Sequence, residues 1–134
     1  MGNSMAIFLD ASFLIALYSE DDVHHKRALE LSGHISQYGN RFTSDDVVDE
    51  AVSVTLRKWG RRQSLEILNN IVGSLPIFTN DKFTFDKGVD FFRATPHNFS
   101  LTDCMILAVL EVTGTRHIVT FDKEFKKAEV NVVD

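Results

Sequence analysis

Short continuous apolar runs alternate along this chain with longer segments whose apolar residues recur at helical spacing. Because buried parallel strands are apolar on both faces, the runs predict strands at residues 6–9, 41–43, 75–78, 117–120 and 130–133. The longer segments predict helices at residues 13–18, 23–37, 45–59, 61–72, 81–94 and 101–113. Ser12, Ser44 and Asn80 are expected to cap three of these helices, since their side chains can accept hydrogen bonds from free helix N–H groups.

Strands that alternate with helices predict an α/β fold, with a mostly parallel sheet and helices on both faces. Pro76 places the third strand at an edge of that sheet. The 134 residues are expected to form a single domain over residues 1–134, because no linker or repeat divides them. Met1 and Met5 both fit as a first residue, and residues 1–5 are expected to be a disordered or non-native start.

Composition limits the classes of protein that fit. The net charge of −5 argues against a protein that coats nucleic acid by electrostatics alone, although acids gathered in one site would give the same count. Cys104 is the single cysteine and lies in an apolar segment, which excludes an internal disulfide and predicts a small core residue. No basic leader or membrane-length apolar run is present, so we expect a cytoplasmic protein without a membrane partner.

Four acidic residues are expected at one edge of the sheet. Asp10 directly follows the first predicted strand, Asp122 nearly follows the fourth, and Asp103 lies in the first turn of the last long helix. Glu50 lies roughly 7 Å into its helix, and helical side chains lean back toward the N-terminus and thus toward the strand ends. Sites in open α/β sheets form beyond these strand ends.

Each acid also has a structural explanation when it is taken alone. Asp10 fits a helix cap, Asp103 a partner of the helix dipole, Asp122 a turn former, and Glu50 a solvated helix residue. Four converging carboxylates would repel one another, and such a cluster raises its pKa values or binds cations. Oxygen ligands without His or Cys favour Mg²⁺ or Mn²⁺, and one or two such ions can activate water for displacement at phosphorus.

The same residues resemble the motifs of PIN-domain ribonucleases, whose members of this length are mostly VapC-type toxins. The resemblance extends in order along nearly the whole chain. The matching segments are Leu9-Asp10-Ala11-Ser12, the helical Glu50, Leu101-Thr102-Asp103, and VTFDKEF at residues 119–125. The resemblance implies a three-layer α/β/α sandwich with strand order 3-2-1-4-5. It also implies a site in which catalytic Asp10, Glu50, Asp103 and Asp122 hold Mg²⁺ or Mn²⁺.

Further expectations follow from this resemblance. Ser12 and Thr120 would support the acids by hydrogen bonds, and Glu124 falls where some members carry an extra acid. The activity would be cleavage of RNA to 5′-phosphate and 3′-hydroxyl ends. The partners would be a cognate VapB-type antitoxin and a second copy of the chain. The main alternative is a non-catalytic or RNA-processing PIN-domain protein that binds RNA or a protein without acting as a toxin.

Two other protein classes fit less well. A haloacid dehalogenase-type phosphatase needs a second Asp two positions after Asp10, where this chain has Ser12. A receiver domain needs an acidic pair at the first strand and a phosphoacceptor after the third, where Asp81 is a weak match.

Three further groups have open roles. Arg57, Lys58, Arg61 and Arg62 form a basic run at a predicted helix junction, which fits either an RNA or partner contact or a solvated junction. A further apolar set is predicted to lie mostly in the core, with some members at a homodimer surface: Phe13, Leu14, Leu17, Tyr18 and the aromatic residues at positions 83, 85, 91 and 92. The histidine pair at positions 24–25 is predicted to be solvated, and His117 to begin a strand.

Overall fold

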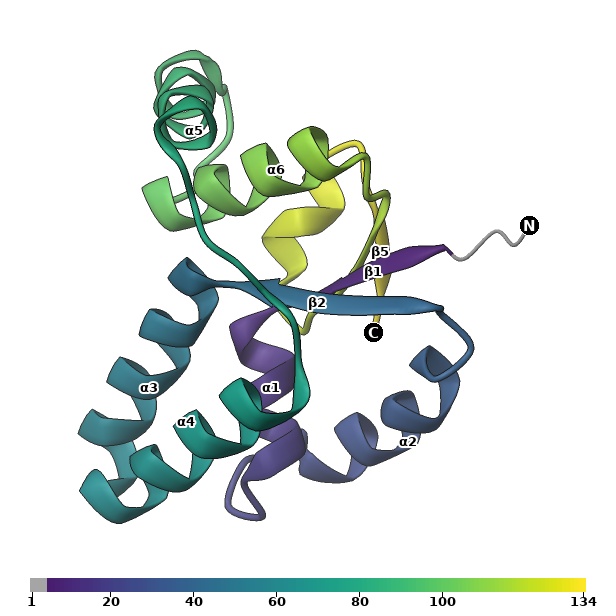
Figure 1. Cartoon of the computed structure of the whole chain (residues 1–134), viewed down its shortest axis with the longest axis vertical. Helices are drawn as coiled ribbons and strands as arrows, with labels where there is room; N and C mark the ends of the chain where they lie inside the picture. Colours follow the sequence, from purple (N-terminus) through teal and green to yellow (C-terminus); the bar gives the residue numbers. More distant parts are fainter. Residues whose placement is uncertain (1–4) are drawn as a thin grey trace.

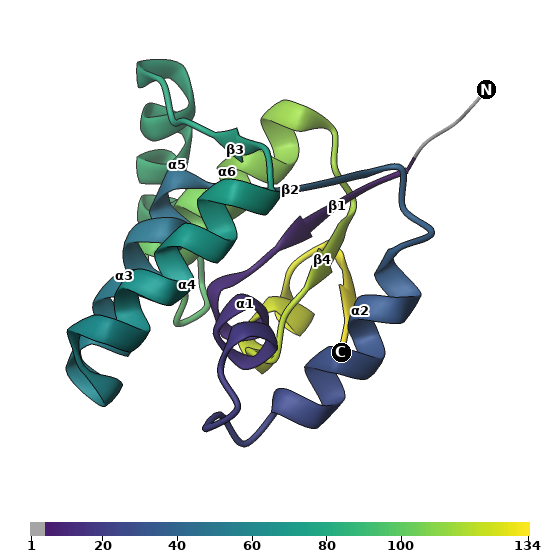
Figure 2. The same ribbon diagram turned by 60° about the horizontal axis from the view of Figure 1, so that its bottom comes forward.

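Within residues 5–134, which the computed structural model describes, five strands form one parallel sheet in the order β3-β2-β1-β4-β5. The strands are β1 (Ala6–Leu9), β2 (Asn40–Ser44), β3 (Ile77–Phe78), β4 (His117–Val119) and β5 (Asn131–Val133). β1 is central, because it pairs with β2 on one side and with β4 on the other (Figure 2). The order confirms the expectation from the resemblance. Of residues 1–5, which were expected to be a disordered or non-native start, only Met5 belongs to the described residues.

Helices cover both faces of this sheet, as the alternating pattern predicted. They are α1 (Ala11–Tyr18), α2 (His25–Ile35), α3 (Asp45–Trp59), α4 (Arg61–Ser74), α5 (Lys82–Ala94), α6 (Leu101–Thr113) and the short 3₁₀ helix η1 (Lys123–Lys127). Figure 1 shows α5 and α6 on one side of the sheet and α1, α2 and α4 on the other. Among the described residues, no helix combines the length and apolar character that a membrane crossing requires.

Two predicted helix caps are wrong, because the side chains bind distant partners instead. Helix α1 begins at Ala11, with Asp10 rather than Ser12 at the N-cap position. Helix α5 is capped by Asp81, whose carboxylate accepts a hydrogen bond from Thr84 N, and Asn80 lies outside it. Ser44 caps α3 as predicted. The predicted helix at residues 23–37 is shorter, and the predicted strand at residues 75–78 keeps only its last two residues.

The core lies between the sheet and both helical layers, and it includes the fully buried Cys104, as predicted. Of the residues predicted to lie mostly in the core, Phe13 and Leu14 are fully buried, whereas three aromatic residues of α5 are exposed. Phe83, Phe85 and Phe92 are 66%, 50% and 49% exposed, because α5 packs on α6 along one face only (Figure 1). Gly88 lies at that contact, where an added Cβ would come within 2.5 Å of the Met105 sulfur.

Candidate active site

Asp10 is the buried member of the predicted acidic group. It directly follows β1, and only 5% of its surface is exposed. Burial disfavours its charged form and raises the pKa of its carboxyl group to about 6, although hydrogen bonds from Thr120 and Ala11 act against this rise. The charges of Asp122 and Asp103 raise the pKa further. Asp10 is therefore a carboxylate that the fold holds at an energetic cost.

Glu50 lies on α3 and faces the same group of acids. The residue as a whole is exposed, yet partial burial of its carboxyl group raises its pKa to about 7. The charges of Asp10, Asp103 and Asp122 contribute to this rise in that order. The Glu50 carboxyl group is therefore within electrostatic reach of the other three predicted site residues.

Asp103 combines a structural role with a place in the site. Its backbone N–H donates to Ser100 Oγ at 3.0 Å, and its carboxylate accepts from Ser100 N at 3.0 Å, which forms a capping box at the start of α6. Burial raises the pKa of Asp103, the hydrogen bonds from Ser100 act against this, and the charges of Asp122 and Glu124 raise it further. The capping box thus fixes the Asp103 carboxylate in the acidic region.

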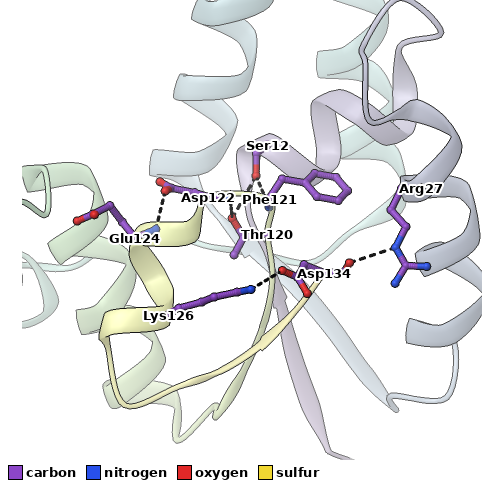
Figure 3. A network of polar contacts seen from close by, with 8 residues as sticks. All are labelled: Ser12, Arg27, Thr120, Phe121, Asp122, Glu124, Lys126 and Asp134. Carbon is purple, nitrogen blue, oxygen red and sulfur yellow. Dashed lines mark hydrogen bonds and ion pairs between the residues drawn. The ribbon is translucent and has the colours of Figure 1, made fainter.

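A chain of hydroxyl groups, of which Figure 3 draws Ser12 and Thr120, orients Asp10. Thr120 Oγ1 donates to Asp10 Oδ2 at 2.6 Å and accepts from Asp122 N at 3.0 Å. Ser12 Oγ lies 3.1 Å from Thr120 Oγ1 and accepts from Phe121 N at 2.9 Å. Because the single Thr120 proton is directed to Asp10, the Ser12 hydroxyl can donate either to Thr120 Oγ1 or to Asp10 Oδ2, which lies 3.5 Å away. Ser12 and Thr120 thus form hydrogen bonds at the acids, while their supporting roles in catalysis stay a prediction.

Asp122 and Glu124 lie together at the start of η1. Asp122 Oδ1 accepts from Glu124 N at 3.0 Å (Figure 3). Glu124 Oε1 pairs with Lys127 Nζ at 2.7 Å. Glu124 Oε2 is buried and has no hydrogen-bond partner among the described residues. One buried carboxylate oxygen close to Asp103 is therefore left without a donor.

The acids interact through their charges, but they do not form a finished ion site. Among residues 5–134, no three His, Cys, Asp or Glu side chains are arranged so that they could hold a metal ion as they stand. The sequence therefore predicted the region in which the acids gather, whereas their role as metal ligands stays a prediction.

The comparisons with known proteins agree with this arrangement. The PIN-domain family matches residues 7–131. The chain belongs to the PIN-domain family. It is 22% identical to ribonuclease VapC1 of Aquifex aeolicus, over 98% of this chain and 91% of that protein.

Solved structures share the PIN fold of this chain. Mycobacterium tuberculosis VapC20, a toxin that cleaves the sarcin–ricin loop, superposes with a TM-score of 0.83 at 22% identity, over 92% of this chain and 98% of that one. A chain of VapBC2 from Rickettsia felis, solved with promoter DNA, superposes with a TM-score of 0.70 at 13% identity, over 96% and 98%.

Three acids precede Glu50 on α3 of this PIN domain, and the structure separates the roles of two of them from that of Glu50. Asn80 Nδ2 donates to Asp45 Oδ1 at 2.7 Å and to Asp46 Oδ2 at 2.5 Å. Burial and the charge of Asp45 raise the pKa of Asp46. Because Asp45 and Asp46 bind Asn80, these contacts support Glu50 as the α3 member of the site.

Thr43 is a residue that the sequence reasoning missed. Strand β2 lies between β1 and β3. Its pairing with β1 ends where Phe42 is opposite Phe8, and the two strands diverge beyond that point, while Thr43 is opposite Ile77 of β3. At this divergence the buried Thr43 hydroxyl donates to Leu9 O at 2.8 Å. The hydroxyl group therefore anchors the peptide that leads into Asp10. No local sequence signal indicates where neighbouring strands diverge.

The basic run of the PIN domain lies away from the acids. Arg57, Lys58, Arg61 and Arg62 are all exposed around the junction of α3 and α4. Arg57 lies roughly 10 Å farther along α3 than Glu50, at 1.5 Å per residue. The structure thus places these cations on the α3–α4 hairpin, outside the acidic region.

Proposed function

We propose that this PIN domain is a metal-dependent endoribonuclease that hydrolyses RNA phosphodiester bonds and leaves 5′-phosphate and 3′-hydroxyl ends. The observation that carries the proposal is that the pKa values of Asp10, Glu50 and Asp103 are all raised, first by burial and further by the charges of neighbouring acids. Carboxylates that are hard to ionise together gain most from a bound cation. The ribonuclease and toxin activities of the relatives support the same proposal.

The proposed cofactor is one or two Mg²⁺ or Mn²⁺ ions, held by Asp10, Glu50, Asp103 and Asp122. These side chains offer the hard oxygen donors that such ions prefer. The unpartnered Oε2 of Glu124 supplies a further oxygen at the same place. Ion binding would require the carboxylates to rotate toward one another, since they do not converge as they stand. A bound ion would lower the pKa of water and offset charge on the phosphate.

The chain's own residues would prepare this chemistry. Thr120 holds Asp10 Oδ2 and also binds Asp122 N, so one hydroxyl group fixes two of the four acidic segments. Glu50, which faces the other acids from α3, would help to orient the attacking water.

We also propose that the enzyme is the toxin of a VapBC-type pair, with a VapB-type antitoxin as its protein partner. The solved VapBC assemblies of Rickettsia felis and Salmonella typhimurium support this partner. Arg57, Lys58, Arg61 and Arg62 would contact the RNA backbone or an acidic partner segment. The exposed phenylalanines of α5 are compatible with the predicted homodimer.

The second candidate is a non-catalytic or RNA-processing PIN-domain protein that binds RNA or a protein partner. The observation that favours it is that no three acidic side chains in the described region are already arranged around an ion position.

The test compares cleavage of structured RNA by wild type, Asp103→Asn and Asp90→Asn, with magnesium, manganese or a chelator. Asparagine at position 103 keeps an oxygen for Ser100 N, so the charge is removed without loss of that hydrogen bond. Asp90 is the matched control, because it lies on exposed α5 beside Arg93, at 3.6 Å.

We expect metal-dependent cleavage by wild type and Asp90→Asn, and a loss of roughly a hundredfold or more in Asp103→Asn. Equal cleavage by Asp103→Asn, or cleavage that chelation leaves unchanged, would contradict the mechanism. RNA binding without cleavage by wild type would establish the second candidate instead.

A further inference from the structure

Two aromatic rings stack beside the acidic region. The centroids of the His24 and Phe121 rings lie 4.5 Å apart, and the ring planes are 15° from parallel. Phe121 lies between Thr120 and Asp122 in the sequence, so its ring is attached to the segment that supplies one of the four acids. Figure 3 shows the Phe121 ring pointing away from the Asp122 carboxylate.

Both members of the stack are fixed in position. Phe121 N donates to Ser12 Oγ at 2.9 Å, and the Phe13 ring lies 6.4 Å from the Phe121 ring. His24 N donates to Asp22 Oδ1 at 2.8 Å. The two rings therefore come from different segments, each of which is held by its own hydrogen bond.

One face of the His24 ring remains available. Phe121 covers the other face, yet His24 is still an exposed residue, and the neighbouring Val23 is 92% exposed. A third flat ring can therefore stack on this pair from solvent.

The charge of the chain makes such a surface useful to an RNA-binding protein. With a net charge of −5, the chain repels phosphates except where local cations or metal ions act. Stacking of a base on an aromatic ring needs no net charge, and it requires an unpaired base.

Two lysines, Lys26 and Lys123, lie close in the sequence to the stacked residues. Figure 3 shows Arg27 and Lys126 both bound to Asp134, at 3.1 and 3.0 Å. Lys26 and Lys123 are exposed, and neither forms an ion pair within the described residues. Each is two positions in the sequence from one member of the stack, so both are candidate contacts for the phosphates next to a bound base.

We propose that the His24–Phe121 stack binds the base of an unpaired RNA nucleotide next to the scissile phosphate. His24 is then a substrate-contacting residue that favours single-stranded segments over duplex RNA. This inference rests on the proposed ribonuclease function and adds a binding position for a base to it.

The test uses Asp103→Asn protein with magnesium, so that RNA binds without being cleaved. The probes are short single-stranded oligoribonucleotides, each with one 2-aminopurine, whose fluorescence falls when the base stacks. We expect quenching at one probe position. His24→Ala should abolish it and raise Kd roughly five- to 150-fold, the usual effect of losing one base stack. His24→Phe should retain both, and His34→Ala, which changes an exposed histidine at the other end of α2, should have no effect.

In otherwise wild-type enzyme, His24→Ala should raise KM for single-stranded RNA and leave kcat nearly unchanged. Unchanged quenching and Kd in His24→Ala, or equal binding of the fully paired duplex, would overturn the proposal. Failure of the ribonuclease function has a different signature. It would appear as a lack of metal-dependent cleavage by wild type, while the His24-dependent quenching persists.

Discussion

Replacing Asp10 by Asn removes a buried charge with almost no change in shape, and it should stabilise the metal-free protein at alkaline pH. The pKa of Asp10 is about 6 in the folded chain, against an ordinary value of 3.8. At roughly 1.4 kcal/mol per pH unit, the charge lowers the free energy of unfolding by about 3 kcal/mol above both values. The amide oxygen of Asp10→Asn can still accept the hydrogen bond from Thr120. We therefore expect a gain of about 2–3 kcal/mol near pH 8.

The pH dependence has a definite sign. Between its two pKa values, Asp10 binds a proton in the folded chain but not in the unfolded chain. The free energy of unfolding of wild type should therefore rise as pH falls from about 6 to about 4, where it meets that of Asp10→Asn. Glu50 acts in the same direction between pH 4.5 and about 7, but its exposure reduces the energy involved.

Denaturant titrations followed by circular dichroism, with a chelator present and at several pH values, measure this free energy. Asp90→Asn is the surface control and should follow wild type. Equal or lower stability of Asp10→Asn near pH 8 would refute the view that Asp10 is a costly buried charge. Excess magnesium should stabilise wild type and leave Asp10→Asn nearly unchanged, since it binds the folded acids.

Three further predictions concern stability. Gly88→Ala should lower the free energy of unfolding by roughly 1–3 kcal/mol, because the added Cβ would lie 3.1 Å from Met105 Cα. The control Gly33→Ala, whose added Cβ would have no atom within 4 Å, should instead raise the free energy of unfolding by up to about 1 kcal/mol. Denaturant titration distinguishes the two, and a stabilising Gly88→Ala would contradict the close helix contact. Ser100→Ala should lower the free energy of unfolding by about 1 kcal/mol, because the α6 cap is lost. A thermal melt should show a lower melting temperature, and an unchanged melting temperature would argue against the capping box. Millimolar magnesium should raise the melting temperature of wild type more than that of Asp103→Asn, and equal shifts would place the ion elsewhere.

Much of the fold could be predicted from the sequence because local signals and long-range packing agree. Helix α6 has the predicted bounds, with Ser100 as its cap and Gly114 in the left-handed conformation after it. Two predicted caps were wrong because the local signals and the long-range packing disagree at those positions. Ser12 binds Phe121 N across the site, and Asn80 binds the acids at the start of α3. Local preference gives no information on partners more than 30 residues away in the chain.

The acidic region could be predicted because the C-terminal ends of parallel strands meet at one edge. Asp10 and Asp122 follow paired strands, so sheet topology alone brings them close. The contact of the Thr43 hydroxyl with Leu9 O depends on where neighbouring strands diverge. The stack of His24 on Phe121 depends on the conformation of one loop. Such details arise from tertiary structure and leave no pattern in the sequence.

The pairing of β1 with β4 has a consequence for when activity can arise during synthesis. Leu9 lies opposite Val119 in the parallel register, so Asp10 and Asp122 come together only when the chain extends beyond residue 122. A nascent chain that ends before α6 carries Asp10 and Glu50 but neither of the other two acids. A nascent chain or a product of termination that ends before residue 122 therefore lacks the assembled acidic region.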